Sequence, residues 1–412
     1  MSTARKGLLT AIGPGILVAA TGVGAGDLAT AALTGSRLGL AILWAVVLGA
    51  FVKFVLNEGL TRWQLATGET LLEGAMRRLG RTAQYIFLAY LLAWSFMVAA
   101  ALMSASGIAA HAILPVAADP SDGKIIYGAL LSLVGLAMVR IGGYRLFEKV
   151  MGFFIAVMFV TVLITAILLK PPLGAVLKGL AWPSIPDLAG NGLSWTIALM
   201  GGVGGTVTVL CYGYWIREEG RGSAEDLAAC RFDLGVAYAV TALFGMAMVV
   251  IGSAIEADGK GATLVIRLAD RLGGELGTLG KWAFLIGAFG AIFSSLLGVW
   301  QSVPYLFSDL WGMMRAGDSP PPPVSTDSAV YRWFLYGLAV LPMAGLWVGF
   351  AKMQKTYAVF GAVFMPMLAL VLLLLNGRAD WIGRQYRNRP LTTILLLLIL
   401  IFFAAAGYLA VA

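Results

Sequence analysis

Long apolar segments follow one another through almost the whole chain of 412 residues. A helix that crosses a bilayer needs about 20 predominantly apolar residues, so a chain built from such segments folds within a membrane. The segments, numbered as helices 1 to 11 in chain order, are at residues 9–34, 38–61, 83–111, 124–141, 145–169, 193–217, 230–255, 279–310, 330–350, 354–376 and 391–411. We therefore predict an all-α membrane protein with about eleven transmembrane helices.

The composition supports the same conclusion. Hydrophobic residues make up 60% of the chain and charged residues 12%, whereas soluble domains carry about 25% charged residues. The net charge of +8 reflects Lys and Arg in loops that we place in the cytoplasm, including Arg62, Arg77 and Arg389, and not a nucleic-acid partner. We expect an integral protein of a bacterial cytoplasmic (inner) membrane, with its N-terminus in the cytoplasm and its C-terminus outside.

Residues for redox or metal chemistry are scarce. The chain has two cysteines, Cys211 and Cys230, and one histidine, His111. This set provides no disulfide framework, no cysteine or histidine metal motif and no multi-histidine proton relay. The sequence also lacks the zinc-protease and nucleophile-elbow motifs. We predict a protein that is not an enzyme and has no cofactor, a monomer whose partners are the lipid bilayer and a small solute or metal ion.

Two helices are interrupted by glycine in the same way. Helix 1 contains Thr21-Gly22-Val23-Gly24-Ala25-Gly26-Asp27, and helix 6 contains Gly201-Gly202-Val203-Gly204-Gly205-Thr206. Each glycine costs about 1 kcal/mol relative to alanine in a helix, so such clusters favour local unwinding. Unwound backbone at membrane depth must be buried in protein or line a cavity. A matching pair of interrupted helices is typical of inverted-repeat transporters with a site at the membrane midplane. We predict repeats at residues 9–169 and 193–376, with 391–411 as an extra helix.

Close helix packing is the alternative explanation of these glycines. Gly22 and Gly26 have the small-xxx-small spacing of packed membrane helices, but Gly24 points in another direction around a helix. The match between the two clusters favours the breaks. The predicted substrate- or ion-binding residues are Thr21, Gly22, Gly24, Gly26, Asp27, Gly202, Gly204, Gly205, Thr206, Thr208 and Gln301.

Four segments are distinctive: Gly13-Pro14-Gly15, the stretch from Arg62 to Leu71, the segment from Arg145 through Phe153, and the pair Ser294-Ser295. Together they resemble the Nramp (natural resistance-associated macrophage protein) family of metal transporters. The resemblance covers about residues 10–376. It implies the leucine-transporter-like fold, in which helices 1–5 and 6–10 are inverted repeats and helices 1 and 6 are broken.

The departures from the family pattern fall on its metal site. The family's Asp-Pro-Gly-Asn signature aligns with Gly24-Ala25-Gly26-Asp27, so Gly24 stands at the metal-binding aspartate and Asp27 at the asparagine. The family's Met-Pro-His falls near Gly205-Thr206-Val207, which removes the thioether and the histidine. From Tyr85 to Ala110, helix 3 has no ionisable residue except Tyr85 and Tyr90. The resemblance therefore implies the fold but not transition-metal selectivity, and we expect weak or absent proton coupling.

The remaining donors define three hypotheses. The Asp27 carboxylate, the hydroxyls of Thr21, Thr206 and Thr208, and freed carbonyls are hard ligands that suit a divalent cation such as Mg²⁺, with Mn²⁺ as the family's example. Alternatively, backbone N–H groups at the starts of the half-helices hold an amino acid or another small organic solute. A membrane scaffold or receptor without transport is the third.

Single residues also leave alternatives open. Asp27 either lines the site or caps the half-helix that starts at Leu28. Lys53, near the cytoplasmic end of helix 2, is expected to extend its ammonium group to the membrane interface, with an ion pair to another helix as the alternative. Thr206 and Thr208 have the same two alternatives as Asp27, lining the site or capping, and Gln301 of helix 8 is a candidate that could reach the central cavity. In transport, helices 1 and 6 would rock against helices 3, 4, 8 and 9.

Overall fold

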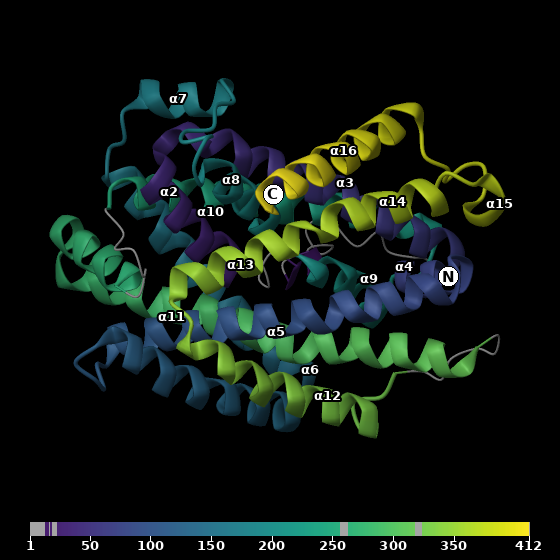
Figure 1. Ribbon diagram of the computed structural model, residues 1–412, viewed down its shortest axis with the longest axis horizontal. Helices are drawn as coiled ribbons and strands as arrows, with labels where there is room; N and C mark the ends of the chain where they lie inside the picture. Colours follow the sequence, from purple (N-terminus) through teal and green to yellow (C-terminus); the bar gives the residue numbers. More distant parts are fainter. Residues whose placement is uncertain (1–12, 16, 19–22, 256–262, 318–323, 412) are drawn as a thin grey trace, which may run out of the picture.

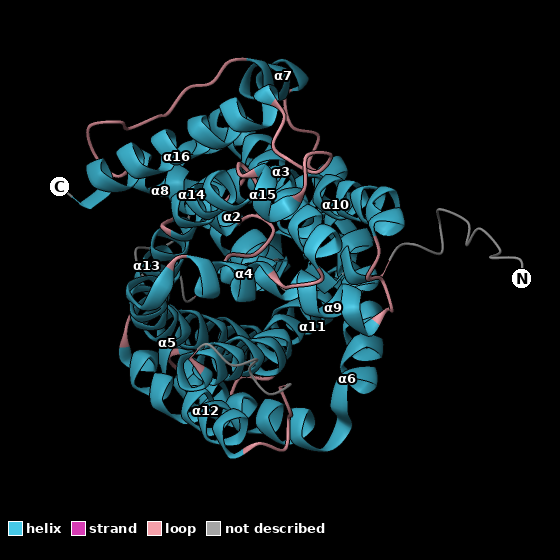
Figure 2. Ribbon diagram, turned by 90° about the vertical axis from the view of Figure 1, so that its right-hand side faces the viewer, coloured by secondary structure: helices cyan, strands magenta, loops and turns pink. Residues whose placement is uncertain are grey.

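The computed structural model describes residues 13–15, 17–18, 23–255, 263–317 and 324–411. Within these ranges, Figure 2 shows helices joined by loops and no strand. A helix satisfies its own backbone N–H and C=O groups, which lipid cannot do. An all-helical architecture is therefore what the apolar sequence predicts.

The first half of the described chain runs from the end of predicted helix 1 to predicted helix 5. Its elements are π-helical η2 (Val23–Thr30), α2 (Ala31–Leu38), 3-10 η3 (Gly39–Ile42), α3 (Leu43–Thr67), α4 (Leu71–Arg78), α5 (Gly80–Ile113), α6 (Pro120–Leu168) and α7 (Leu173–Ala181).

The second half begins with predicted helix 6, which is divided into α8, η4 and α9. Its elements are α8 (Gly192–Gly202), η4 (Val207–Cys211), α9 (Tyr212–Glu218), η5 (Ala224–Asp226), α10 (Leu227–Ser253), α11 (Leu264–Ala316), α12 (Ala329–Val340), η6 (Leu341–Trp347), α13 (Phe350–Ala362), α14 (Phe364–Leu375), α15 (Ala379–Ile382) and α16 (Pro390–Val411).

Nine helices of the described residues are long and apolar enough to cross a membrane, or ten with the bent pair Phe159–Leu168 and Leu173–Ala181. One of the nine, Asp27–Thr67, contains the end of predicted helix 1 and all of predicted helix 2. These two parts meet at Gly39, where a φ of 67° changes the direction of the chain. The count of about eleven spans is compatible with this division.

Two predicted boundaries are wrong. The loop expected between residues 141 and 145 is helical, because α6 runs from Pro120 to Leu168 and no proline interrupts it after its first turn. Predicted helix 8 is preceded by a further helical segment, from which it is separated by a non-helical residue, Gly277. The sequence analysis did not anticipate the short loop helices. One of them, α4, begins with a capping box between Thr70 and Glu73, a signal that is visible in the sequence.

Two groups of helices enclose the broken one. In the first, α5, α6 and α11 pack on one another; Figure 1 shows α5 and α11 crossing the molecule side by side. In the second, α10 packs against α2 and α3, while α8 contacts α3 and α13. The C-terminal α16 lies along α14 at the periphery, and its exposed Leu397, Leu398 and Ile401 suit contact with lipid.

Candidate cation site at the break of helix 6

The helix 6 break lies between α8 and η4, at residues 203–206. Gly204 and Gly205 have φ angles of 72° and 83°, a region that residues with a Cβ atom avoid. Two consecutive residues of this kind end the helical hydrogen-bonding pattern and turn backbone groups away from the helix axis. The predicted break in helix 6 is confirmed, and glycine is required where it occurs.

Lys53 of α3 reaches this break from the side. Its side chain is fully buried, and its Nζ donates hydrogen bonds to the carbonyl oxygens of Gly201 at 2.9 Å, Val203 at 2.8 Å and Gly205. The expectation that Lys53 extends to the interface is therefore wrong. The break supplies carbonyls without helical partners, and these replace the water that the ammonium group would otherwise seek.

Asp27 of η2 approaches the same break. Its side chain is also fully buried, and both of its oxygens accept from the backbone N–H of Gly204, at 3.2 and 3.3 Å. Because Asp27 lies inside η2 and not at its start, the capping interpretation is wrong. The carboxylate instead connects the described part of helix 1 to the break of helix 6.

The two charges thus bind complementary groups of one short backbone segment. Carbonyls of the break accept from the Lys53 ammonium, while the Gly204 N–H is directed at the Asp27 carboxylate. The two side chains also attract each other electrostatically. A helix end carries partial charges that favour this arrangement, since the C-terminal carbonyls of α8 attract a cation.

Further polar side chains surround this centre. Asn57, one turn after Lys53, donates through Nδ2 to the Tyr238 hydroxyl at 3.1 Å, and Gln354 of α13 donates to the Thr30 hydroxyl at 3.0 Å. All four are buried. The sequence analysis missed Tyr238, Thr30 and Gln354 as neighbours of the site. Gln354 had a usable signal, because an amide within an apolar span has to find a partner inside the protein.

The predicted site residues have different positions in the structure. Thr21 and Gly22 lie outside the described residues. Gly24 and Gly26 belong to η2, so this part of helix 1 is a widened helix and not the unwound segment that we predicted. A π-helix keeps its backbone bonded, which explains how Gly24 and Gly26 remain helical.

The remaining candidates belong to helices 6 and 8. Gly202 ends α8, while Thr206 and Thr208 are buried at the start of η4. Gln301 of α11 accepts at its backbone carbonyl from the Tyr331 hydroxyl at 3.1 Å, and its buried amide oxygen has no partner among the described residues. Its participation in the site stays a prediction.

The charged donors of the centre are few. In the part of the chain that the structure describes, no group of three or more His, Cys, Asp or Glu side chains is placed to hold a metal ion. A cation at the break would have Asp27, backbone carbonyls and water as ligands. All of these are hard oxygen donors, which suit Mg²⁺ better than ions that favour sulfur.

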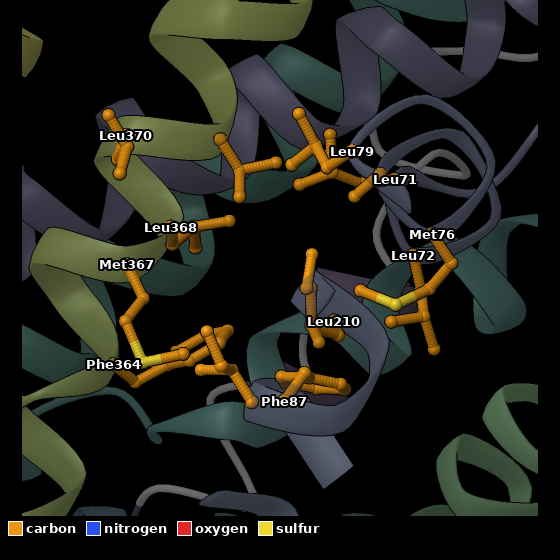
Figure 3. Close-up of a pocket in the computed structure, with 14 residues that line it drawn as sticks. Leu71, Leu72, Met76, Leu79, Phe87, Leu210, Phe364, Met367, Leu368 and Leu370 are labelled. Atoms are coloured by element: carbon orange, nitrogen blue, oxygen red, sulfur yellow. The ribbon is translucent and has the colours of Figure 1, made fainter. Parts of the chain in front are cut away.

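A separate apolar cavity of about 230 Å³ lies among α4, α5 and α14 (Figure 3). Leu72, Met76, Phe87, Leu210 and Met367 are among its lining residues, and none of the lining residues is a predicted site residue. Hydrocarbon walls do not compensate for the lost hydration of an ion. The lining of this cavity therefore does not suit a cation.

The family model described as "Natural resistance-associated macrophage protein-like" matches residues 15–412. This chain belongs to the Nramp family. Two relatives are both described as "Divalent metal cation transporter MntH". The protein from Pectobacterium carotovorum is 24% identical over 61% of this chain and 60% of its own length, and the one from Mycobacterium tuberculosis is 27% identical over 69% and 66%. The chain thus spans less than two thirds of either relative.

Solved structures show the fold of this Nramp-family chain. A manganese transporter variant from Eremococcus coleocola superposes with a TM-score of 0.71 at 17% identity, over 99% of this chain and 88% of the other. MhsT in complex with L-phenylalanine superposes with a TM-score of 0.63 at 18% identity, over 96% and 97%. The predicted leucine-transporter-like fold is confirmed, as is the predicted family.

Proposed function

We propose that this Nramp-family protein is a secondary transporter of a hard divalent cation, for which Mg²⁺ is the leading candidate and Mn²⁺ the comparison. The observation that carries the proposal is the fully buried Asp27 carboxylate at the Gly204 amide of the helix 6 break. An ionisable group at membrane depth is costly and marks a functional site by default. The MntH relatives support a metal-ion cargo.

The donor chemistry favours a hydrated, hard ion. Mg²⁺ keeps several waters and is commonly bound through one or two carboxylates, which matches the single acidic side chain of the centre. The described surroundings of Asp27 contribute amide and hydroxyl groups, including those of Gln354 and Thr30. Selectivity among divalent cations would then depend on size and hydration rather than on ligand softness.

Alternating access is the proposed transport mechanism. Its moving part would be helix 6, since the break at Gly204 and Gly205 permits α8 and α9 to change angle independently. Its fixed part would be the mutually packed α5, α6 and α11. The cargo would bind between them, where Asp27 and the break meet.

A second candidate cargo is favoured by one specific observation. The break already holds an ammonium group on its carbonyls and a carboxylate on its amide, both from the protein itself. A zwitterionic amino acid carries the same two charges in one small molecule. Such a solute would find complementary groups at the break if Lys53 and Asp27 released them.

Isothermal titration of the purified protein distinguishes the two cargoes. We expect Mg²⁺ or Mn²⁺ to bind the wild type, Asp27→Ala to abolish that binding, and a mixture of amino acids to give no heat. Asp270→Ala is the matched control, because Asp270 is an exposed partner of Lys281 near the start of α11. Heat from amino acids, without heat from either cation, would transfer the proposal to the organic solute.

A further inference from the structure

We propose that Lys53 is a built-in counter-cation: its ammonium group occupies the position at the helix 6 break that a cargo cation takes, so that ammonium and cargo exclude each other. The inference deepens the proposed function and rests on it for the identity of the cargo. It makes Lys53 a specificity-determining residue, because any cation that enters must displace an ammonium group already bound.

The hydrogen-bond geometry is the first support. An ammonium group has three N–H donors, and Lys53 uses them on three carbonyls that come from a single turn of backbone, those of Gly201, Val203 and Gly205. In transporters with broken helices, freed carbonyls and the C-terminal ends of half-helices coordinate the coupling cations. Lys53 provides from within the chain the positive charge that such an end attracts.

The charge balance is the second support. With Lys53 protonated and Asp27 ionised, the described centre carries one positive and one negative charge, both fully buried. A divalent cation added beside a fixed ammonium would leave two uncompensated positive charges in a medium of low dielectric constant. The same cation finds three carbonyls and a carboxylate once the ammonium group has left them.

The sequence of the site agrees with this exchange. Gly24 stands where the family places its metal-binding aspartate, and the thioether of helix 6 is absent. Both changes reduce the attraction of the site for a free cation. The ammonium group of Lys53 instead pairs with the carbonyls of the break, which would otherwise have no partner. A purely structural role, in which Lys53 only fastens α3 to helix 6, is the competing explanation.

Lys53→Met separates the two explanations, because methionine has a similar length and no charge. In isothermal titration, we expect the purified variant to bind Mg²⁺ and Mn²⁺ at least about tenfold more tightly than the wild type. We also expect these chlorides to raise its melting temperature, with a smaller effect on the wild type. Lys124→Met is the matched control. Lys124 is also a buried lysine that donates to a backbone carbonyl, that of Val348 at 2.7 Å, but it lies away from the helix 6 break.

A destabilised variant that binds cations no better than the wild type would overturn the inference and leave Lys53 a structural fastener. If Lys53→Met does not fold, Lys53→Gln replaces it, because the glutamine amide retains two N–H donors for the carbonyls. Its affinity for the cations is compared with that of the wild type in the same way. Tight binding by the variant without any binding by the wild type would support the counter-cation while removing the proposed function. Equal binding of the cations by both proteins would support the proposed function and overturn the counter-cation.

Discussion

Gly204 shows at the scale of one residue how the site is built. Its φ of 72° points its N–H at Asp27, and the space beside its Cα is closed by another helix. A Cβ atom there would lie 2.8 Å from the ring of Tyr238. Both the backbone angle and the lack of a side chain are therefore required at this position.

We predict that Gly204→Ala lowers the free energy of unfolding by about 2 kcal/mol or more, because alanine is strained at positive φ and meets the Tyr238 ring. The melting temperature in detergent is the readout. Gly174→Ala is the control, since Gly174 is helical in α7 and a Cβ atom there has nothing within 4 Å. Equal melting temperatures for Gly204→Ala and the wild type would show that the break is not held as described.

Lys53 and Asp27 also belong to this scale. Burying two charges within a membrane protein costs more than apolar residues of similar size would, so their presence indicates a role beyond stability. The break compensates both charges by hydrogen bonds to its own backbone. The cation site that we propose, and the ammonium group that we propose to occupy it, are thus both held by the five residues 201–205 and the side chains of Lys53 and Asp27.

At the scale of elements, a second buried carboxylate, that of Asp233, joins three helices, one of which is the start of helix 1. Asp233 of α10 accepts from the backbone N–H of Gly13 and Gly15, from the Tyr212 hydroxyl of α9 at 2.9 Å, and from Arg221 at 3.4 Å. The start of helix 1, the second half of helix 6 and α10 are therefore fastened together, on the side that we predict to be cytoplasmic. Any opening of that side has to release these bonds.

We predict that Asp233→Asn raises the rate at which a thiol reagent labels the native cysteines by several-fold. Cys211 and Cys230 are buried, and both lie next to the bonds that the substitution weakens. Loss of the ion pair and of one acceptor should also cost about 1–3 kcal/mol of stability. Labelling is measured by mass spectrometry in detergent at a temperature well below unfolding.

Asp226→Asn serves as the control for this experiment, because Asp226 only binds the nearby Ser223 and Gly222 at the exposed start of α10. Labelling that is unchanged in Asp233→Asn, while the protein remains folded, would show that the Asp233 bonds do not restrain opening.

At the scale of the whole molecule, the sequence predicts most of the architecture. Hydropathy identifies the spans because lipid admits only helices, and the glycine clusters locate the helix 6 break because two residues with positive φ are needed there. Exact ends are less predictable. The continuous α6 and the π-helical η2 depend on neighbouring helices, and neither glycine nor hydropathy distinguishes a widened helix from an unwound one.

The site was predicted only in part, for an identifiable reason. Asp27 and Gly204 are recognisable from their own segments, but the partner of the break carbonyls comes from another helix. Lys53 lies in a span whose sequence fits an interfacial lysine equally well. Its true environment is created by the crossing of α3 and α8, which are far apart in sequence. The Asp233 bonds were missed because their partners likewise come from separate helices.

The central claim is that a cation crosses the membrane through the break beside Asp27. The most direct test is uptake of Mg²⁺ and Mn²⁺ into proteoliposomes that contain the wild type or Asp27→Ala, with Asp270→Ala as the matched control. We expect uptake by the wild type and the control, and uptake at the level of empty liposomes for Asp27→Ala. Uptake that survives in Asp27→Ala, or is absent from the folded wild type for both ions, would contradict it.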